Sequence, residues 1–166
     1  MWRFISLFVV VLAVLFGIEK LNVVQAAAIY PWTSFLAWFS AALMTVFDAD
    51  VISHGRIIQS QASGFGVSIE AGCNGVEAVI ILMAGMVAFP APMRLKLIGV
   101  LIGCVAVQAA NILRVISLYY LGKWDKEVFD FAHLYLWQAL IMLDVLVVWL
   151  LWIRAVAKKQ GASLAA

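Results

Sequence analysis

Charged residues are scarce in this chain of 166 residues. Only 12% are Asp, Glu, Lys or Arg, whereas soluble domains carry about 25%. Hydrophobic residues make up 66%, which is more than a soluble core of this size can cover. The net charge is only +2 and no basic run alternates with aromatic residues, so the pattern excludes a nucleic-acid-binding protein. The composition predicts an integral membrane protein.

Cysteine and histidine are also rare, with two of each. Cys73 and Cys104 form neither a Cys-x-x-Cys pair nor a cluster with zinc spacing. Two cysteines are too few for a disulfide framework, and a disulfide-generating oxidoreductase needs a redox pair. We therefore expect no metal and no cofactor.

Five apolar stretches are present, at residues 4–21, 30–47, 74–89, 95–121 and 133–153. A membrane-spanning helix needs about 20 residues. The first stretch lacks an Ala-x-Ala-like cleavage site in the usual place, so we expect an uncleaved first helix. Basic residues without acids gather in residues 90–96 and in the C-terminal tail, which the positive-inside rule assigns to the cytoplasm.

Because Arg3 also favours a cytoplasmic start, the number of crossings is expected to be even. We predict that residues 30–47 do not cross but form an interfacial helix or pack partly into the bundle. Small or polar residues recur there at helical spacing, opposite a large apolar face: Thr33, Ala37, Ser40, Ala41 and Met44.

Residues 48–72 alternate apolar and polar side chains with glycines between them. This pattern predicts a short β-hairpin on the extracytoplasmic surface. The expected fold class is an all-α polytopic membrane protein with about four transmembrane helices, one interfacial helix and this hairpin. We expect a single membrane-embedded domain over residues 1–166.

Three reactive side chains fall at the same membrane face of this topology: Cys73, Arg114 and His133. Cysteine attacks as its thiolate, and a helix N-terminus or a nearby cation lowers the thiol pKa, so a lowered pKa is expected. His133 is a candidate general base and acid, and Arg114 is a candidate donor to the developing oxyanion. Gly72 and Gly75 allow a peptide backbone to approach the sulfur.

Three further polar residues have two interpretations each. Glu70 either orients His133 or Arg114 or is simply solvated. Glu77 follows Cys73 by one helical turn, where a carboxylate in lipid is costly, and Arg114 is the expected partner. Asn111 either orients Arg114 or binds substrate backbone, or it forms a helix–helix hydrogen bond.

Three sequence blocks resemble the signature blocks of exosortases and archaeosortases, most closely the compact H-type exosortase. They are residues 70–75 (EAGCNG), 111–115 (NILRV) and 131–133 (FAH). The resemblance implies Cys73 as nucleophile, Arg114 as the residue that stabilises the electrophile and His133 as the third member. Asn74 stands where many relatives have Ser or Thr, which suggests a subgroup with its own recognition motif.

The resemblance also implies a substrate class and a location. Such enzymes cleave exported proteins that end in a short motif, a transmembrane helix and a basic cluster. A thioester acyl-enzyme is expected to form and to pass to an unknown acceptor nucleophile. The implied location is the bacterial inner membrane, in contact with lipid, with the active site facing the periplasm.

Two other classes of protein remain open. A non-catalytic membrane scaffold or small transporter would use the polar residues only to hold the bundle together. An aspartic protease like the lipoprotein signal peptidase needs two facing carboxylates, but Asp48 and Asp50 lie close together in one loop.

Overall fold

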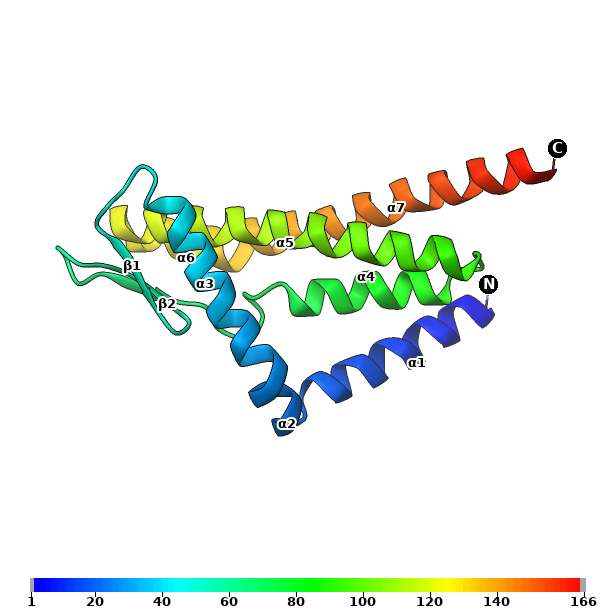
Figure 1. Cartoon of the computed structure of the whole chain (residues 1–166), viewed down its shortest axis with the longest axis horizontal. Helices are drawn as coiled ribbons and strands as arrows, with labels where there is room; N and C mark the ends of the chain where they lie inside the picture. Colours follow the sequence, from blue (N-terminus) through cyan, green and yellow to red (C-terminus); the bar gives the residue numbers. More distant parts are fainter. Residues whose placement is uncertain (1, 165–166) are drawn as a thin grey trace.

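Long helices form most of the structure, a computed structural model that describes residues 2–164 (Figure 1). Among these residues, four helical segments are long and apolar enough to cross a membrane: Trp2–Glu19, Asn22–Met44, Met93–Trp124 and Lys126–Gln160. A fifth apolar helix, α4 (Val76–Ala88), has only 13 residues. The predicted class, an all-α polytopic membrane protein with a small β element, is confirmed.

A sharp corner joins the first two segments. Helix α1 (Trp2–Glu19) is followed by α2 (Asn22–Val24) and by a π-helical turn, η1 (Gln25–Ile29). The amide of Gln25 donates to the Glu19 backbone oxygen at 2.7 Å and to its Oε1 at 2.8 Å. These bonds anchor the corner from which α3 (Tyr30–Met44) begins.

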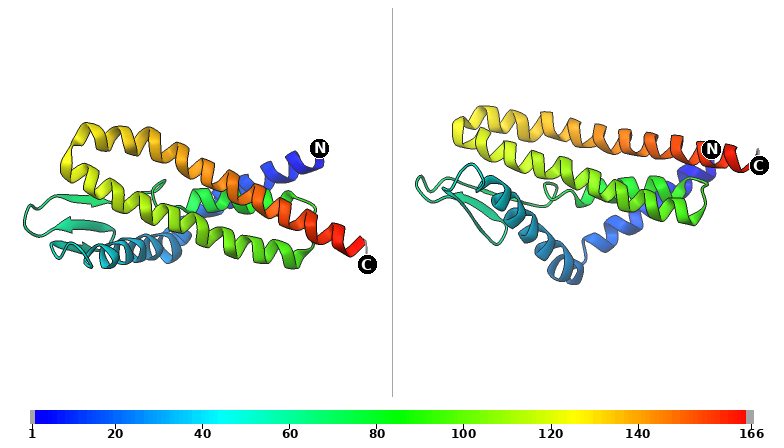
Figure 2. Two further views of the ribbon diagram at one scale, coloured as in Figure 1. Left: turned by 90° about the horizontal axis from the view of Figure 1, so that it is seen from above. Right: turned by 45° about the horizontal axis from the view of Figure 1, so that its top comes forward.

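Helix α3 inclines from this corner towards the sheet and does not return to the end that holds both termini (Figures 1 and 2). That residues 30–47 do not cross stays a prediction, because residues 22–44 are long and apolar enough to span a membrane whereas α4 is shorter. The predicted stripe is the buried face of α3, and Leu36 is buried with it: Thr33, Leu36, Ala37, Ser40, Ala41 and Met44.

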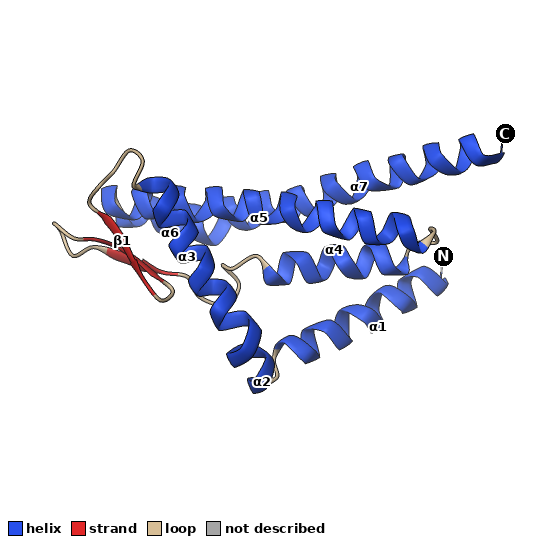
Figure 3. Cartoon of the chain, viewed as in Figure 1, coloured by secondary structure: helices blue, strands red, loops and turns tan. Residues whose placement is uncertain are grey.

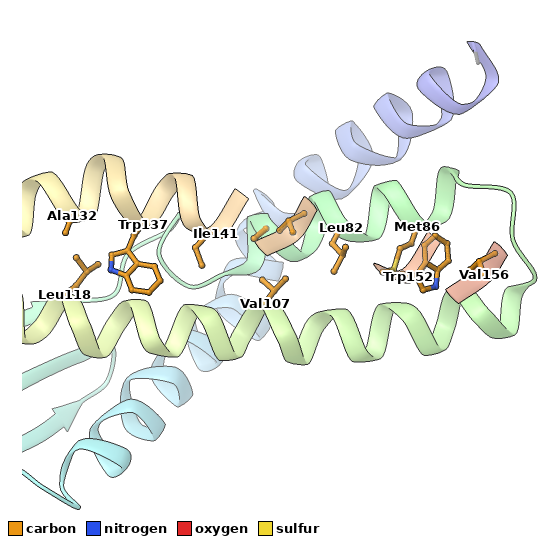
Figure 4. Close-up of a cluster of buried hydrophobic side chains, with 11 residues drawn as sticks. Leu82, Met86, Val107, Leu118, Ala132, Trp137, Ile141, Trp152 and Val156 are labelled. Carbon is orange, nitrogen blue, oxygen red and sulfur yellow. The ribbon is translucent and has the colours of Figure 1, made fainter. Parts of the chain in front are cut away.

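The bundle proper consists of α4, α5 (Met93–Trp124) and α7 (Trp137–Leu164), with α1 packed along α4. Its core is apolar (Figure 4). A Cβ on Gly99 would overlap Nε1 of Trp152, so this glycine lets the indole pack directly on α5. The same indole donates to the Leu95 backbone oxygen at 2.9 Å, which links α7 to α5.

The charged residues 122–132, which follow the fourth apolar stretch, are almost entirely helical. Helix α5 continues to Trp124, and α6 (Lys126–Phe131) begins after a single linking residue, Asp125. The Asp125 carboxylate accepts from the backbone N–H groups of Glu127 and Val128 at 2.8 and 3.0 Å. Aspartate is a favoured N-cap, so a charged stretch that resembled a loop starts a new helix.

The non-helical segment forms a three-stranded antiparallel sheet at one end of the bundle (Figure 3). The predicted hairpin is present as β1 (Val51–His54) and β2 (Ile57–Ser60), with Gly55 in the turn at φ 56°. A third strand, β3 (Gly66–Ser68), pairs with β2, so residues 48–72 form three strands where a two-stranded hairpin was predicted. The sheet packs against α3 and α5 in a second apolar cluster that includes Met44, Val51, Ile58, Ile69 and Tyr119.

Candidate active site

Cys73 lies in the sharp turn that connects β3 to α4. Gly72 and Gly75 have φ values of 84° and 74°, in the left-handed region that L side chains rarely adopt. A Cβ on Gly75 would also lie 2.8 Å from Nε2 of Gln108. Gly75 is therefore required by the turn and by the close approach of α5, whereas no atom lies within 4 Å of the Cβ position at Gly72.

The structure brings together the thiol, the guanidinium and the imidazole singled out from the sequence. Sγ of Cys73 is 3.1 Å from Nε2 of His133, and Nη2 of Arg114 donates to Sγ at 3.5 Å. All three residues line one cavity of about 160 Å³. They come from the turn before α4, from α5 and from the turn before α7, so three distant segments form one cluster.

Arg114 is held almost entirely inside the protein, with 3% of its surface exposed. Its Nη1 donates to the Gly72 backbone oxygen at 3.3 Å. Within residues 2–164 its Nε has no hydrogen-bond partner. The guanidinium thus points both Nη atoms at the cysteine turn, which fixes its position relative to the sulfur.

His133 lies within a π-helical turn, η2 (Ala132–Leu136), that joins α6 to α7. Such turns are frequent at functional sites because the extra residue redirects a side chain. The ring of Phe129 stacks on the imidazole, with centroids 5.4 Å apart and an interplanar angle of 21°. His133 therefore does not open its helix, as the apolar pattern predicted, but lies inside a continuous one.

Burial raises the pKa of the Cys73 thiol above its ordinary value, which corrects the expected lowering. Desolvation is the largest cause, and Glu77 and Glu70 add to it, while the Arg114 guanidinium acts in the opposite direction. The helix dipole acts most strongly within the first turn of a helix. Helix α4 begins only at Val76, so the Cys73 thiol lies outside that turn. The direction of this shift favours the neutral thiol beside the imidazole.

The two glutamates near Cys73 contact other groups than those expected. Glu70 forms a salt bridge with Arg56 at 3.0 Å, on the exposed surface, and contacts neither His133 nor Arg114. Glu77 accepts from the Gly72 backbone N–H at 2.7 Å and makes no ion pair with Arg114. Glu77 can accept from this N–H because it lies in the first turn of α4, immediately after the cysteine turn.

Asn74 is buried and links the cysteine turn to α3 by hydrogen bonds. Its Oδ1 accepts from the Val76 N–H at 3.0 Å and its Nδ2 donates to Oγ1 of Thr33 at 3.3 Å. Its backbone oxygen accepts from the indole of Trp32 at 3.3 Å. Sequence reasoning did not connect α3 to the site, although Thr33 stood in the polar stripe.

Asn111 lies one turn before Arg114 on α5 and is fully buried, with 0% exposure. Among the described residues neither Oδ1 nor Nδ2 has a hydrogen-bond partner. The structure therefore supplies neither the bond to Arg114 nor the helix–helix bond that the sequence suggested. Asn111 lies on α5 between Gln108 and Arg114, the two residues that contact the cysteine turn.

The two loop aspartates are held apart by separate partners. Asp48 accepts from the Tyr120 hydroxyl at 3.2 Å. Asp50 accepts from Ser60 and from the Ala62 N–H, and these bonds lower the pKa of its carboxyl. Two carboxylates sharing one proton would raise a pKa, so the pair does not form an aspartic-protease site. No group of three His, Cys, Asp or Glu residues within 2–164 is arranged to hold a metal ion.

Fold and site together define a multi-pass membrane protein with a cysteine–histidine–arginine cluster at the sheet end of its bundle. Residues 1–153 match the protein family described as transmembrane exosortase (Exosortase_EpsH). The chain belongs to the transmembrane exosortase family, whose general role is protein sorting by transpeptidation in the membrane. Comparisons with curated proteins and with solved structures gave no match.

Proposed function

We propose that this protein is a cysteine transpeptidase that cleaves the C-terminal sorting tails of exported proteins through a thioester. The observation that carries the proposal is the position of Sγ of Cys73, 3.1 Å from Nε2 of His133 and 3.5 Å from Nη2 of Arg114. Nucleophile, base and cationic donor within this range are the parts that acyl transfer requires.

The raised pKa of Cys73 sets the order of proton transfers. In the tautomer protonated at Nδ1, His133 Nε2 accepts the thiol proton as Sγ attacks the scissile carbonyl carbon. Nη2 of Arg114 then leaves the sulfur for the carbonyl oxygen, which becomes negative. When the C–N bond breaks, the imidazolium gives its proton to the leaving amine, and the acyl group stays on sulfur until an acceptor amine or water attacks it.

The proposed orientation puts this site on the extracytoplasmic face of the bacterial inner membrane. The opposite end of the bundle carries Arg94 and Lys96 in the first turn of α5, as the positive-inside rule requires of a cytoplasmic end. A membrane-impermeant maleimide applied to intact spheroplasts of a Cys104→Ser protein should label Cys73. Labelling that occurs only after lysis would invert the orientation.

The test of function is coexpression with an exported protein that ends in a short motif, one transmembrane helix and a basic cluster. We expect a shorter, processed form with the wild type and with Cys104→Ala, and only the full-length form with Cys73→Ala. Cys104 is the matched control because it is the other cysteine, buried in part and remote from the cluster. Processing that persists in Cys73→Ala would remove the nucleophile, as expected of a scaffold or transporter.

A further inference from the structure

Strand β3 lies at the edge of the sheet. The strand order is β1-β2-β3, so β3 pairs with β2 on one side only. The Ser60 N–H donates to the Phe65 oxygen at 2.8 Å and the Ile69 N–H donates to the Arg56 oxygen at 2.9 Å. These two bonds fix which residues of the edge strand face β2.

Bonded residues alternate along an antiparallel ladder. With Phe65 and Ile69 bonded to β2, Val67 between them is bonded too, and Gly66 and Ser68 point their backbone N–H and C=O groups away from the sheet. Gly66 and Ser68 are both exposed. The edge therefore offers two sets of donors and acceptors two residues apart, the spacing that an added strand requires.

Two adjoining cavities follow this edge. The inner one, of about 160 Å³, contains Cys73 and His133, and the outer one, of about 400 Å³, reaches Gly122. They share Val67, Ser68 and Phe129 in their walls. Together they form a groove that ends at the thiol.

The groove runs along the edge of β3, not over one of its faces. Four consecutive residues, 65–68, line the outer cavity, whereas a cavity over one face would contact alternate residues only. The opposite wall is one helical stripe that continues from α6 into η2: Lys126, Phe129, Asp130 and His133.

We propose that the substrate segment preceding the cleavage point binds as an added strand along the outer edge of β3, which delivers its carbonyl to Cys73. This proposal rests on the proposed function. Backbone hydrogen bonds to Gly66 and Ser68 bind the substrate whatever its sequence. Alternate substrate side chains enter the groove and determine which motif is recognised. Val67, Leu118 and Phe129 make the inner part of the groove apolar.

The direction of the added strand follows from α5. Arg114 lines the inner cavity and Gly122, two turns further from the bundle centre, lines the outer one. The groove therefore runs outward from Ser68 to Gly66. A substrate anchored in the membrane after its cleavage point must enter from the outer end, so it lies parallel to β3.

The first test removes the outward N–H of Ser68 with Ser68→Pro, a change that an edge position tolerates. The control is Ser53→Pro on β1, the opposite edge, where Ser53 also lies between residues bonded to β2. We expect processing of the coexpressed tail protein to fall at least about tenfold in Ser68→Pro and to stay within about twofold in Ser53→Pro. Labelling of Cys73 by N-ethylmaleimide in both variants reports that the site is folded.

The second test detects the bound strand without activity. In a Cys73→Ala, Cys104→Ala protein, Gly66→Cys or Ser68→Cys is oxidised with single cysteines placed along the tail. We expect disulfides at every second tail position, because side chains on one face of a sheet recur with period two. The position that links to residue 66 should precede the one that links to residue 68, whereas an antiparallel strand would reverse this order.

The outcomes separate this proposal from the proposed function. If Cys73→Ala processes the tail like the wild type, the proposed function fails. If Ser68→Pro processes the tail as fast as the wild type and Ser53→Pro do, and the disulfides lack the two-residue period, the edge-strand proposal fails while the proposed function stands. If Ser68→Pro does not accumulate, the disulfide pattern decides.

Discussion

The two halves of α5 face different surroundings although they belong to one helix. The first half packs through Gly99 and Gly103 against Trp152 and Leu82 of the apolar cluster. The second half carries buried polar groups, and Asn111 has no hydrogen-bond partner among the described residues. An unpaired buried amide costs about 1–3 kcal/mol. The second half of α5 therefore contributes less to the stability of the protein than the first half does.

The difference indicates that one end of the bundle provides stability and the other end holds the candidate active site. The half near the α4–α5 turn holds the helices at fixed distances through glycine contacts. The half near the sheet can then keep Arg114 pointed at Cys73 despite the cost of its burial. Substitutions in the first half should affect stability, and substitutions in the second half should affect processing with the fold retained.

The largest effect is expected for Arg114→Gln. Removing one preorganised donor to an oxyanion lowers the rate about 10²–10³-fold, so tail processing should fall by that factor while the protein still accumulates in the membrane. The measurement is the initial rate of processing in membranes at matched protein levels. Arg114→Lys keeps the charge but loses the paired Nη geometry, so it should recover only part of the rate. Equal rates in Arg114→Gln and the wild type would contradict the expectation that the second half of α5 determines processing.

Gly99→Ala should lower the free energy of unfolding by about 1–3 kcal/mol, because its Cβ overlaps the rigid ring of Trp152. Shifting the ring also breaks its bond to Leu95. The matched control is Gly17→Ala on α1, where no atom lies within 4 Å of the Cβ position. Unfolding of the purified proteins in detergent by increasing SDS measures both. Equal stability of the two variants would mean that the glycine contact does not hold the bundle.

The sequence was sufficient to predict the elements whose signal is local. Apolar stretches located the helices, the spacing of Thr33 to Met44 gave the buried face of α3, and turn glycines gave the β1–β2 hairpin. Local signals failed where a tertiary contact decided the outcome. The predicted two-stranded hairpin has a third strand because β3 also pairs with β2, and the pKa of Cys73 rises because burial outweighs the guanidinium.

The candidate site shows the same limit. Residue types and topology brought Cys73, Arg114 and His133 to one face, but the partners of Glu70, Glu77 and Asn74 depend on turn geometry that no pattern encodes. The link from Asn74 to Thr33 joins residues 41 positions apart. Only a structure reveals such a contact.

Asn74→Ala should destabilise the protein by about 1–2 kcal/mol, because it removes the acceptor for the Val76 N–H and the bond to α3. Asn74→Ser retains a side-chain acceptor and should lose less. Thermal unfolding in detergent gives the stability, and the rate of Cys73 alkylation reports whether the turn has loosened. An alkylation rate that is equal in both variants and the wild type would show that the turn is held without Asn74.

The smallest effect concerns the charges around the thiol. In a Cys104→Ser protein, the rate of Cys73 alkylation by iodoacetamide rises as the thiol ionises, so its midpoint on the pH axis reports the pKa of Cys73. Arg114 lowers this pKa and Glu77 raises it. Arg114→Gln should therefore move the midpoint to higher pH, and Glu77→Gln, which keeps an acceptor for the Gly72 N–H, should move it to lower pH.

The two shifts must have opposite signs if both residues act on the thiol through charge. Lys158→Gln controls for a general change in surface charge, because Lys158 is exposed on α7 at the end of the bundle away from the sheet (Figure 1). Its midpoint should coincide with that of the parent protein. Two shifts in the same direction would mean that both substitutions alter the burial of the sulfur, since burial is the largest cause of its raised pKa. In that case the sheet end of the bundle would depend on packing as strictly as the end that contains Gly99.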